Sequence, residues 1–87
     1  MWKILNNKKV TVYFSDYCGH CTSLKKWLHE REIPFIPMNT EDPDVSNYLQ
    51  EHGINAVPFT IIEDKETNEK EEILGFNLTK FQNIFSE

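Results

Sequence analysis

Two cysteines, Cys18 and Cys21, lie within the segment SDYCGHCTSLKK, and the 87-residue chain contains no others. Thiolates attack disulfides and bind metal ions. The pair is therefore a candidate redox centre, half of a metal site, or a small structural disulfide. The structural role is disfavoured, because a disulfide that closes a loop of only about four residues removes little conformational entropy from the unfolded chain.

A metal site would need more ligands than the pair itself supplies. Structural zinc commonly has four protein ligands, and the chain adds only three histidines to its cysteines. His20 lies between the two thiols, where its ring would be a strained third ligand. His29 and His52 belong to other predicted helical faces, so we interpret them as surface or boundary residues. We expect no metal site within one chain, whereas a zinc or iron–sulfur site shared between two chains stays open as an alternative.

The hydrophobic pattern predicts the elements that position the cysteines. A β-branched and aromatic run at 10–14 predicts a strand buried on both faces, and helical spacing of apolar residues predicts an amphipathic helix over 19–31. A helix after Asp42 should direct Val45, Tyr48, Leu49 and His52 inward. The other predicted elements are strands at 34–39, 57–63 and 71–76, and a last helix capped by Asn77.

The predicted order is β-α-β-α-β-β-α, an α/β fold in one domain over residues 1–87. A strand–helix–strand beginning requires a parallel pair joined by a right-handed crossover. The closing hairpin adds an antiparallel pair, so we expect a four-stranded mixed sheet flanked by helices. The two prolines within 34–39 place that strand at a sheet edge.

Charge and hydropathy narrow the functional classes. The net charge of −5 argues against nucleic acid as a partner, because phosphate binding favours a basic face. The chain has no apolar run near the roughly 20 residues that span a membrane. Its first ten residues hold too short an apolar segment for a signal peptide. We therefore expect a cytoplasmic protein, and in that reducing compartment a close cysteine pair is usually catalytic or metal-binding.

The predicted elements place Cys18 at a helix N-terminus and Cys21 within the first turn. Free N–H groups and the helix dipole favour an anion there, and thiolate is the reactive form. Cys18 is thus the candidate nucleophile, and Cys21 can attack the mixed disulfide that Cys18 forms. His20 could stabilise the thiolate by a hydrogen bond or by charge. Alternatively, His20 is a solvent-exposed turn residue without influence.

With a strand, Cys-x-x-Cys and a helix in this order, the chain resembles the thioredoxin-fold redoxins, especially the glutaredoxins and glutaredoxin-like NrdH-redoxins. The resemblance runs from Val10 to Phe85. Ala56-Val57-Pro58 matches the place where this fold carries a cis-proline. The resemblance implies that Pro58 is cis beside the active-site disulfide and that Val57 offers its backbone to a substrate strand. Alternatively, Pro58 merely begins a strand.

The residues before the last helix separate the subfamilies. Gly75-Phe76 resembles the Ser-Gly-Phe of NrdH-redoxins, whereas glutaredoxins that use glutathione typically carry Gly-Gly, a small residue and two acids there. The resemblance implies that the Gly75 backbone approaches the disulfide and that Phe76 faces a partner protein. Alternatively, Phe76 is a core residue after a turn. The Gly19-His20 dipeptide departs from both groups and resembles protein disulfide isomerase, which leaves the direction of electron flow open.

Together these features predict a cytosolic dithiol–disulfide oxidoreductase without a cofactor beyond the Cys18–Cys21 disulfide. We expect a monomer, and the resemblance implies thioredoxin reductase as electron donor and ribonucleotide reductase as an acceptor. The expected partner-binding residues are Tyr17, Gly19, Val57, Pro58, Gly75 and Phe76. One alternative is a glutathione-coupled glutaredoxin. An alternative of another class is an iron–sulfur or zinc-binding module that uses the cysteine pair.

Overall fold

The structure, a computed structural model, describes residues 8–85; residues 1–7, which carry most of the segment weighed as a signal peptide, lie outside them together with 86–87. The order of elements confirms the predicted β-α-β-α-β-β-α. The elements are β1 (Lys8–Phe14), α2 (Gly19–Glu30), β2 (Ile36–Asn39), α3 (Pro43–Glu51), β3 (Phe59–Asp64), β4 (Lys70–Leu74) and α4 (Leu78–Phe85).

The four strands form one mixed sheet in the order β2-β1-β3-β4. β1 pairs in parallel with β2 and antiparallel with β3, and β3 pairs antiparallel with β4. This confirms the expected mixed sheet and places β2 at its edge, where Pro37 does not interrupt an internal ladder. The register sets Val12 opposite Thr60, and Thr60 opposite Ile73.

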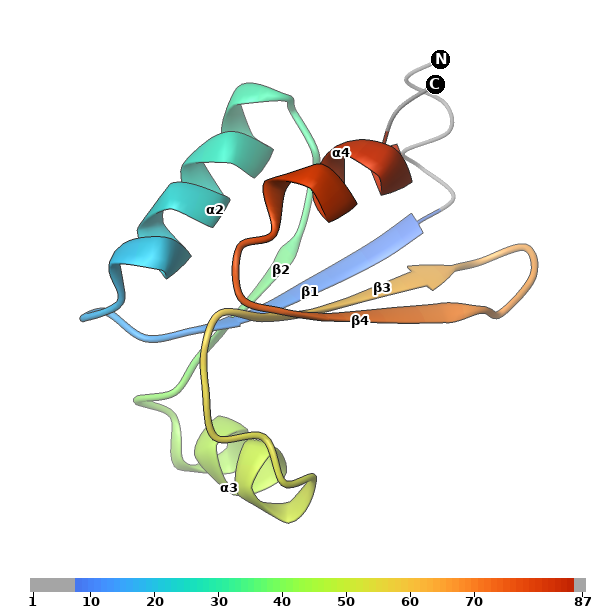
Figure 1. The fold of residues 1–87 in the computed structure, drawn as a ribbon. Helices are drawn as coiled ribbons and strands as arrows, with labels where there is room; N and C mark the ends of the chain where they lie inside the picture. Colours follow the sequence, from blue (N-terminus) through green and yellow to red (C-terminus); the bar gives the residue numbers. More distant parts are fainter. Residues whose placement is uncertain (1–7, 86–87) are drawn as a thin grey trace.

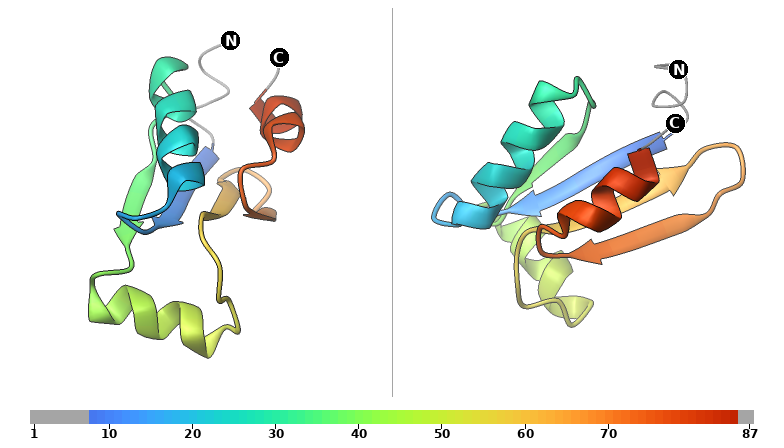
Figure 2. Two further views of the ribbon diagram at one scale, coloured as in Figure 1. Left: turned by 60° about the vertical axis from the view of Figure 1, so that its left-hand side comes forward. Right: turned by 45° about the horizontal axis from the view of Figure 1, so that its top comes forward.

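Helices cover both faces of the sheet, with α2 and α4 on one face and α3 on the other (Figures 1 and 2). Side chains of β1 alternate between the two layers because successive residues of a strand point to opposite faces. Val10, Val12 and Phe14 join the cluster under α2 and α4, whereas Tyr13 packs with Val45 and other residues of the α3 side. β1 is therefore buried on both faces, as its hydrophobic run predicts.

The helix caps follow the sequence signals, with one exception. Asp42 caps α3 by accepting the N–H of Asp44 at 2.9 Å, and Asn77 caps α4 by accepting that of Lys80 at 3.1 Å. The prediction that His52 points inward is wrong. The helix ends at Glu51, so His52 takes the cap position with an exposed side chain, and its Nδ1 lies 2.8 Å from the Tyr48 carbonyl oxygen.

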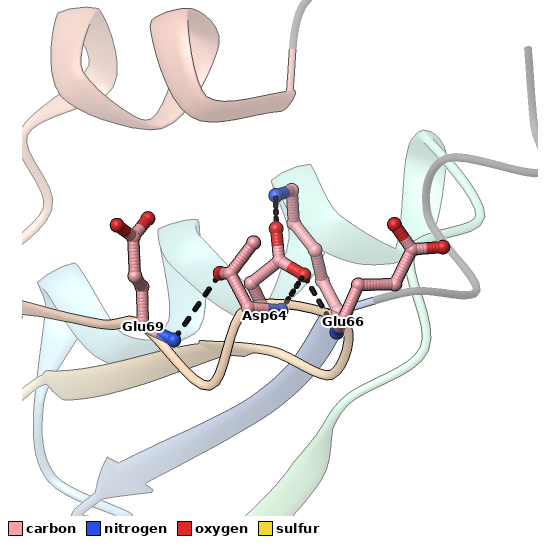
Figure 3. Close-up of polar contacts among 5 residues, drawn as sticks. Asp64, Glu66 and Glu69 are labelled. Atoms are coloured by element: carbon pink, nitrogen blue, oxygen red, sulfur yellow. Dashed lines mark hydrogen bonds and ion pairs between the residues drawn. The ribbon is translucent and has the colours of Figure 1, made fainter.

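The predicted hairpin between β3 and β4 turns around Asp64 (Figure 3). The Asp64 carboxylate accepts N–H groups of Glu66 and Thr67 at 2.9 and 3.3 Å, and one of its oxygens lies 3.7 Å from Nζ of Lys8. The first of these backbone hydrogen bonds is the main cause that lowers the Asp64 pKa. The turn lies at the end of the sheet away from the cysteines (Figure 1).

Candidate active site

Cys18 ends the loop that follows β1 and is the N-cap residue of α2. Its Sγ atom accepts the N–H of Cys21 at 3.0 Å, a bond that a serine or aspartate side chain makes at other helix starts. The Cys18 carbonyl oxygen accepts both the N–H and the hydroxyl of Thr22 at 3.2 Å. The expected position of the first cysteine is thus confirmed, with its sulfur among the free N–H groups of the helix.

The two thiols differ sharply in their surroundings. Both are free cysteines, and Cys18 is half-buried whereas Cys21 is 0% exposed. Cys21 belongs to the apolar cluster that contains Val12 and Leu24. Burial raises the pKa of Cys21 to about 11, with a smaller contribution from its hydrogen bond with Cys18. Cys21 is therefore a protonated thiol at neutral pH, protected from solvent.

The loop before β3 lies against the first thiol. The Val57–Pro58 peptide bond is cis, which confirms the expectation for that bond. The Val57 carbonyl oxygen accepts a hydrogen bond from Sγ of Cys18 at 3.6 Å across 39 positions of sequence. The Pro58 side chain is fully buried, so a partner would meet the backbone of this loop and the half-buried Val57.

The turn after β4 contacts the same loop. The Gly75 N–H donates to the Pro58 carbonyl oxygen at 2.7 Å, and Gly75 has φ +81°, a conformation that favours glycine. Phe76 is half-buried, with ring centroids 6.4 Å from Trp27 and 5.8 Å from Phe81. Phe76 thus combines the two interpretations of its role, since it packs on the aromatic cluster and keeps part of its ring exposed.

The remaining predicted residues surround the thiols without entering their contacts. Tyr17 is 91% exposed directly before Cys18, and Gly19 is the exposed first residue of α2. His20 is exposed as well, and its side chain forms no hydrogen bond with another residue of the described part of the chain. These three residues can reach a docking protein, because none is held in the core.

A hollow of about 300 Å³ opens between α3 and the loop that precedes Pro58. Val57 contributes to its wall, so the hollow begins next to the carbonyl that contacts Cys18. Its apolar lining is suited to a side chain of a partner strand. The lining residues are Thr40, Ser46, Leu49, Gln50, Ile54, Asn55, Ala56 and Val57.

Two contacts near the thiols were not expected from the sequence. Asn39 at the end of β2 donates to the Asp16 carboxylate at 3.2 Å, which ties the loop before Cys18 to the sheet edge. Nζ of Lys25 lies 3.6 Å from the centroid of the Phe14 ring. The spacing of four residues from Cys21 to Lys25 indicates only that these two residues are neighbours on α2, and no sequence signal pointed to the Phe14 ring.

The mixed sheet, its flanking helices and the Cys-x-x-Cys pair at the start of α2 define a thioredoxin-fold dithiol protein. Comparison of folds agrees: the structure of the NrdH-redoxin from Escherichia coli superposes with a TM-score of 0.72 at 21% identity, covering 91% of this chain and 96% of that one. Thioredoxin f from spinach chloroplast superposes with a TM-score of 0.69 at 19% identity, covering 97% and 81%.

Sequence comparison identifies the family. Residues 10–69 match the glutaredoxin family. The glutaredoxin-like protein NrdH of Lactococcus lactis is 39% identical over 56 residues, which span 63% of this chain and 78% of that protein. The chain therefore belongs to the glutaredoxin family and is a thiol–disulfide oxidoreductase of the glutaredoxin-like type.

Residues 8–85 lack two features that other classes of protein carry. No helix in this range has the length and apolar character that crossing a membrane requires. Within the same residues, no three His, Cys, Asp or Glu side chains gather in a group that could hold a metal ion.

Proposed function

We propose that Cys18 and Cys21 divide the work of disulfide reduction between them. The observation that carries this proposal is their difference in burial, with Cys18 half-buried at a helix N-terminus and Cys21 completely enclosed. Only the first thiol is accessible to a disulfide on another protein. The second lies within hydrogen-bond distance of the first through its N–H, so it is near any mixed disulfide formed at Cys18.

The reaction proceeds in two exchanges. The Cys18 thiolate attacks one sulfur of the substrate disulfide, which breaks and releases the first substrate thiolate. Cys21 then loses its proton and attacks Sγ of Cys18, which forms the Cys18–Cys21 disulfide and releases the second substrate thiolate. The substrate gains two electrons, and the protein loses two. A reductase must return them before the next cycle.

We propose that the residues around Cys18 bind the partner and tune the pair. Exposed Tyr17 and half-exposed Val57 and Phe76 supply an apolar contact surface of the kind that protein interfaces use. The Val57 backbone can pair with an extended substrate segment beside the hollow. His20, exposed on the first turn of α2, is proposed to stabilise the Cys18 thiolate and so make the disulfide more oxidising.

We further propose that thioredoxin reductase is the electron donor, that ribonucleotide reductase is an acceptor, and that the protein acts in the cytoplasm as a monomer. The likeness to NrdH proteins supports this, and the E. coli NrdH-redoxin is described as having a thioredoxin-like activity profile. The local charge also argues against glutathione, an anion, because the residue before Tyr17 is Asp16. A glutathione site would need basic side chains beside Cys18 to offset that carboxylate.

The donor assay follows NADPH consumption with one disulfide acceptor and two donor systems. We expect catalytic turnover with thioredoxin reductase and slow turnover with glutathione and glutathione reductase. Efficient turnover with glutathione and none with thioredoxin reductase would assign the protein to the glutathione-coupled glutaredoxins. Cys18→Ser should abolish turnover, whereas Cys21→Ser should accumulate a covalent mixed disulfide with the acceptor, visible by mass spectrometry and lost on reduction.

A further inference from the structure

Lys25 is held close to the core by an aromatic ring. It lies one helical turn after Cys21 on α2, and its side chain is half-buried. Its Nζ sits 3.6 Å from the centroid of the Phe14 ring, and Phe14 itself is only 7% exposed at the end of β1. A cation over the face of a ring is attracted to it. The ammonium is thereby kept at the edge of the cluster that contains Cys21 rather than extended into solvent.

The charge of Lys25 is not neutralised by a neighbouring carboxylate of the described chain. Within residues 8–85, the ion pair that forms is Lys8–Asp64, at the far end of the sheet. The adjacent Lys26 is exposed and is not placed over a ring of residues 8–85. The two neighbouring lysines therefore have equal formal charge and different positions, which makes Lys26 a matched control for Lys25.

Cys21 is the thiol whose ionisation a nearby cation would favour. Burial and the neighbouring Cys18 raise its pKa, whereas the backbone at Ser15 and the Lys25 ammonium act in the opposite direction. The other buried residues of its cluster are apolar side chains of β1, α2, β3, β4 and α4, together with Ile33 of the loop after α2. Cys18 and Lys25 are thus the charged or titratable groups in the described chain that act on Cys21.

We propose that Lys25 is a positioning residue for the second exchange, in which its ammonium, seated on the Phe14 ring, stabilises the Cys21 thiolate as it attacks Cys18. This inference rests on the proposed roles of the two cysteines. Cys21 must give up its proton inside an apolar cluster, where an isolated anion is unfavourable. A cation one turn away lowers the cost of that anion without contacting the substrate, so Lys25 should affect the second exchange and leave the first unchanged.

The test separates the two exchanges with 2,2′-dipyridyl disulfide. Cys18 attacks the reagent and releases one thiopyridone, and Cys21 then attacks Sγ of Cys18, forms the protein disulfide and releases the second. Both electrons come from the two protein thiols, and the reagent is fully reduced. Stopped-flow absorbance of thiopyridone gives one rate for each phase. The rates are measured across pH for the wild type, Lys25→Gln, Lys25→Arg and Lys26→Gln.

We expect Lys25→Gln to raise the pH midpoint of the second phase by about half a unit, because the Lys25 ammonium is the smallest contribution to the Cys21 pKa and burial is the largest. The thiolate fraction near neutral pH then falls about threefold, while the more basic thiolate is about 1.7-fold more nucleophilic, so the second phase slows about twofold. The first phase should be unchanged. Lys25→Arg should restore the second phase, and Lys26→Gln should match the wild type.

The outcomes of this experiment separate the proposed role of Lys25 from the proposed roles of the two cysteines. If the wild type releases two thiopyridones and Lys25→Gln keeps the same second-phase rate and pH midpoint, the inference is wrong and the dithiol mechanism stands. If Lys26→Gln slows the second phase as much as Lys25→Gln does, the effect comes from net charge and the inference about Lys25 is wrong. If the wild type releases only one thiopyridone, the resolving role of Cys21 fails, and the inference fails with it.

Discussion

The raised pKa of Cys21 makes a quantitative prediction about alkylation of the reduced protein. Burial moves this pKa from 9.0 to about 11. At pH 7 the thiolate fraction of Cys21 is then about one in ten thousand, roughly a hundredfold below that of an ordinary thiol. A more basic thiolate is more nucleophilic, by about six- to tenfold over two pKa units. The net expectation is that Cys21 reacts at least about tenfold more slowly than an unperturbed cysteine, before its complete burial slows it further.

The assay exposes reduced protein at pH 7 to one equivalent of iodoacetamide and maps the label by peptide mass spectrometry. We expect nearly all of the label on Cys18, because its sulfur is partly exposed at the start of α2. In the Cys18→Ser variant, labelling of Cys21 should be slow and should rise about tenfold per pH unit toward pH 11. Unfolding in urea should remove the difference between the thiols and serves as the control. Equal labelling of both cysteines in the folded protein would refute the assignment of roles.

Four further predictions concern stability and potential. The free energy of unfolding of the reduced protein should fall between about pH 9 and 11, by at most about 1.4 kcal/mol per pH unit, because Cys21 ionises at lower pH in the unfolded chain than in the folded one. Urea unfolding at several pH values measures this fall, and its slope against pH should be smaller in Cys21→Ala. The wild-type reduction potential should lie between about −270 and −180 mV, and His20→Pro should make the pair more reducing. Titration against glutathione buffers measures both potentials, and no shift would show that the imidazole does not tune the pair. Gly75→Ala should destabilise by about 1–2 kcal/mol because its φ is +81°, whereas Gly19→Ala, at a helix start with open space, should not. Thr60→Val should stabilise by about 1 kcal/mol in thermal or urea unfolding, because the buried Thr60 hydroxyl has no partner among residues 8–85; a destabilised variant would reveal one.

Local features of the fold could be predicted because each depends on a few neighbouring residues. The apolar run at 10–14, the Asp42 and Asn77 caps and the start of α2 at the cysteine pair all recur in the structure. Periods of two and 3.6 residues report which face of an element is buried, whatever that face packs against. The same local logic fails at an element's end, as at His52, where the helix stops one residue earlier than its apolar stripe suggests.

The contacts around Cys18 could be anticipated only in part. The motif at Val57-Pro58 suggested a loop near the cysteines, but its distance from them, 3.6 Å from the Val57 carbonyl oxygen to Sγ, depends on the antiparallel register of β1 and β3. Phe76 shows the same limit. Its sequence position allowed either a partner-facing or a core residue, and the neighbouring rings of Trp27 and Phe81 decide how much of it is covered.

The sequence by itself determined the class of chemistry, because two thiols separated by two residues at a helix start are brought together by local geometry alone. The tertiary structure decided how the thiols differ. Cys21 is a weaker acid than an ordinary thiol because β1, α2 and α4 enclose it in an apolar cluster. Lys25 approaches that cluster because Phe14 lies at the end of the neighbouring strand. Burial and long-range contacts depend on how separate elements pack, and spacing within one helix carries no record of the ring that lies beneath it.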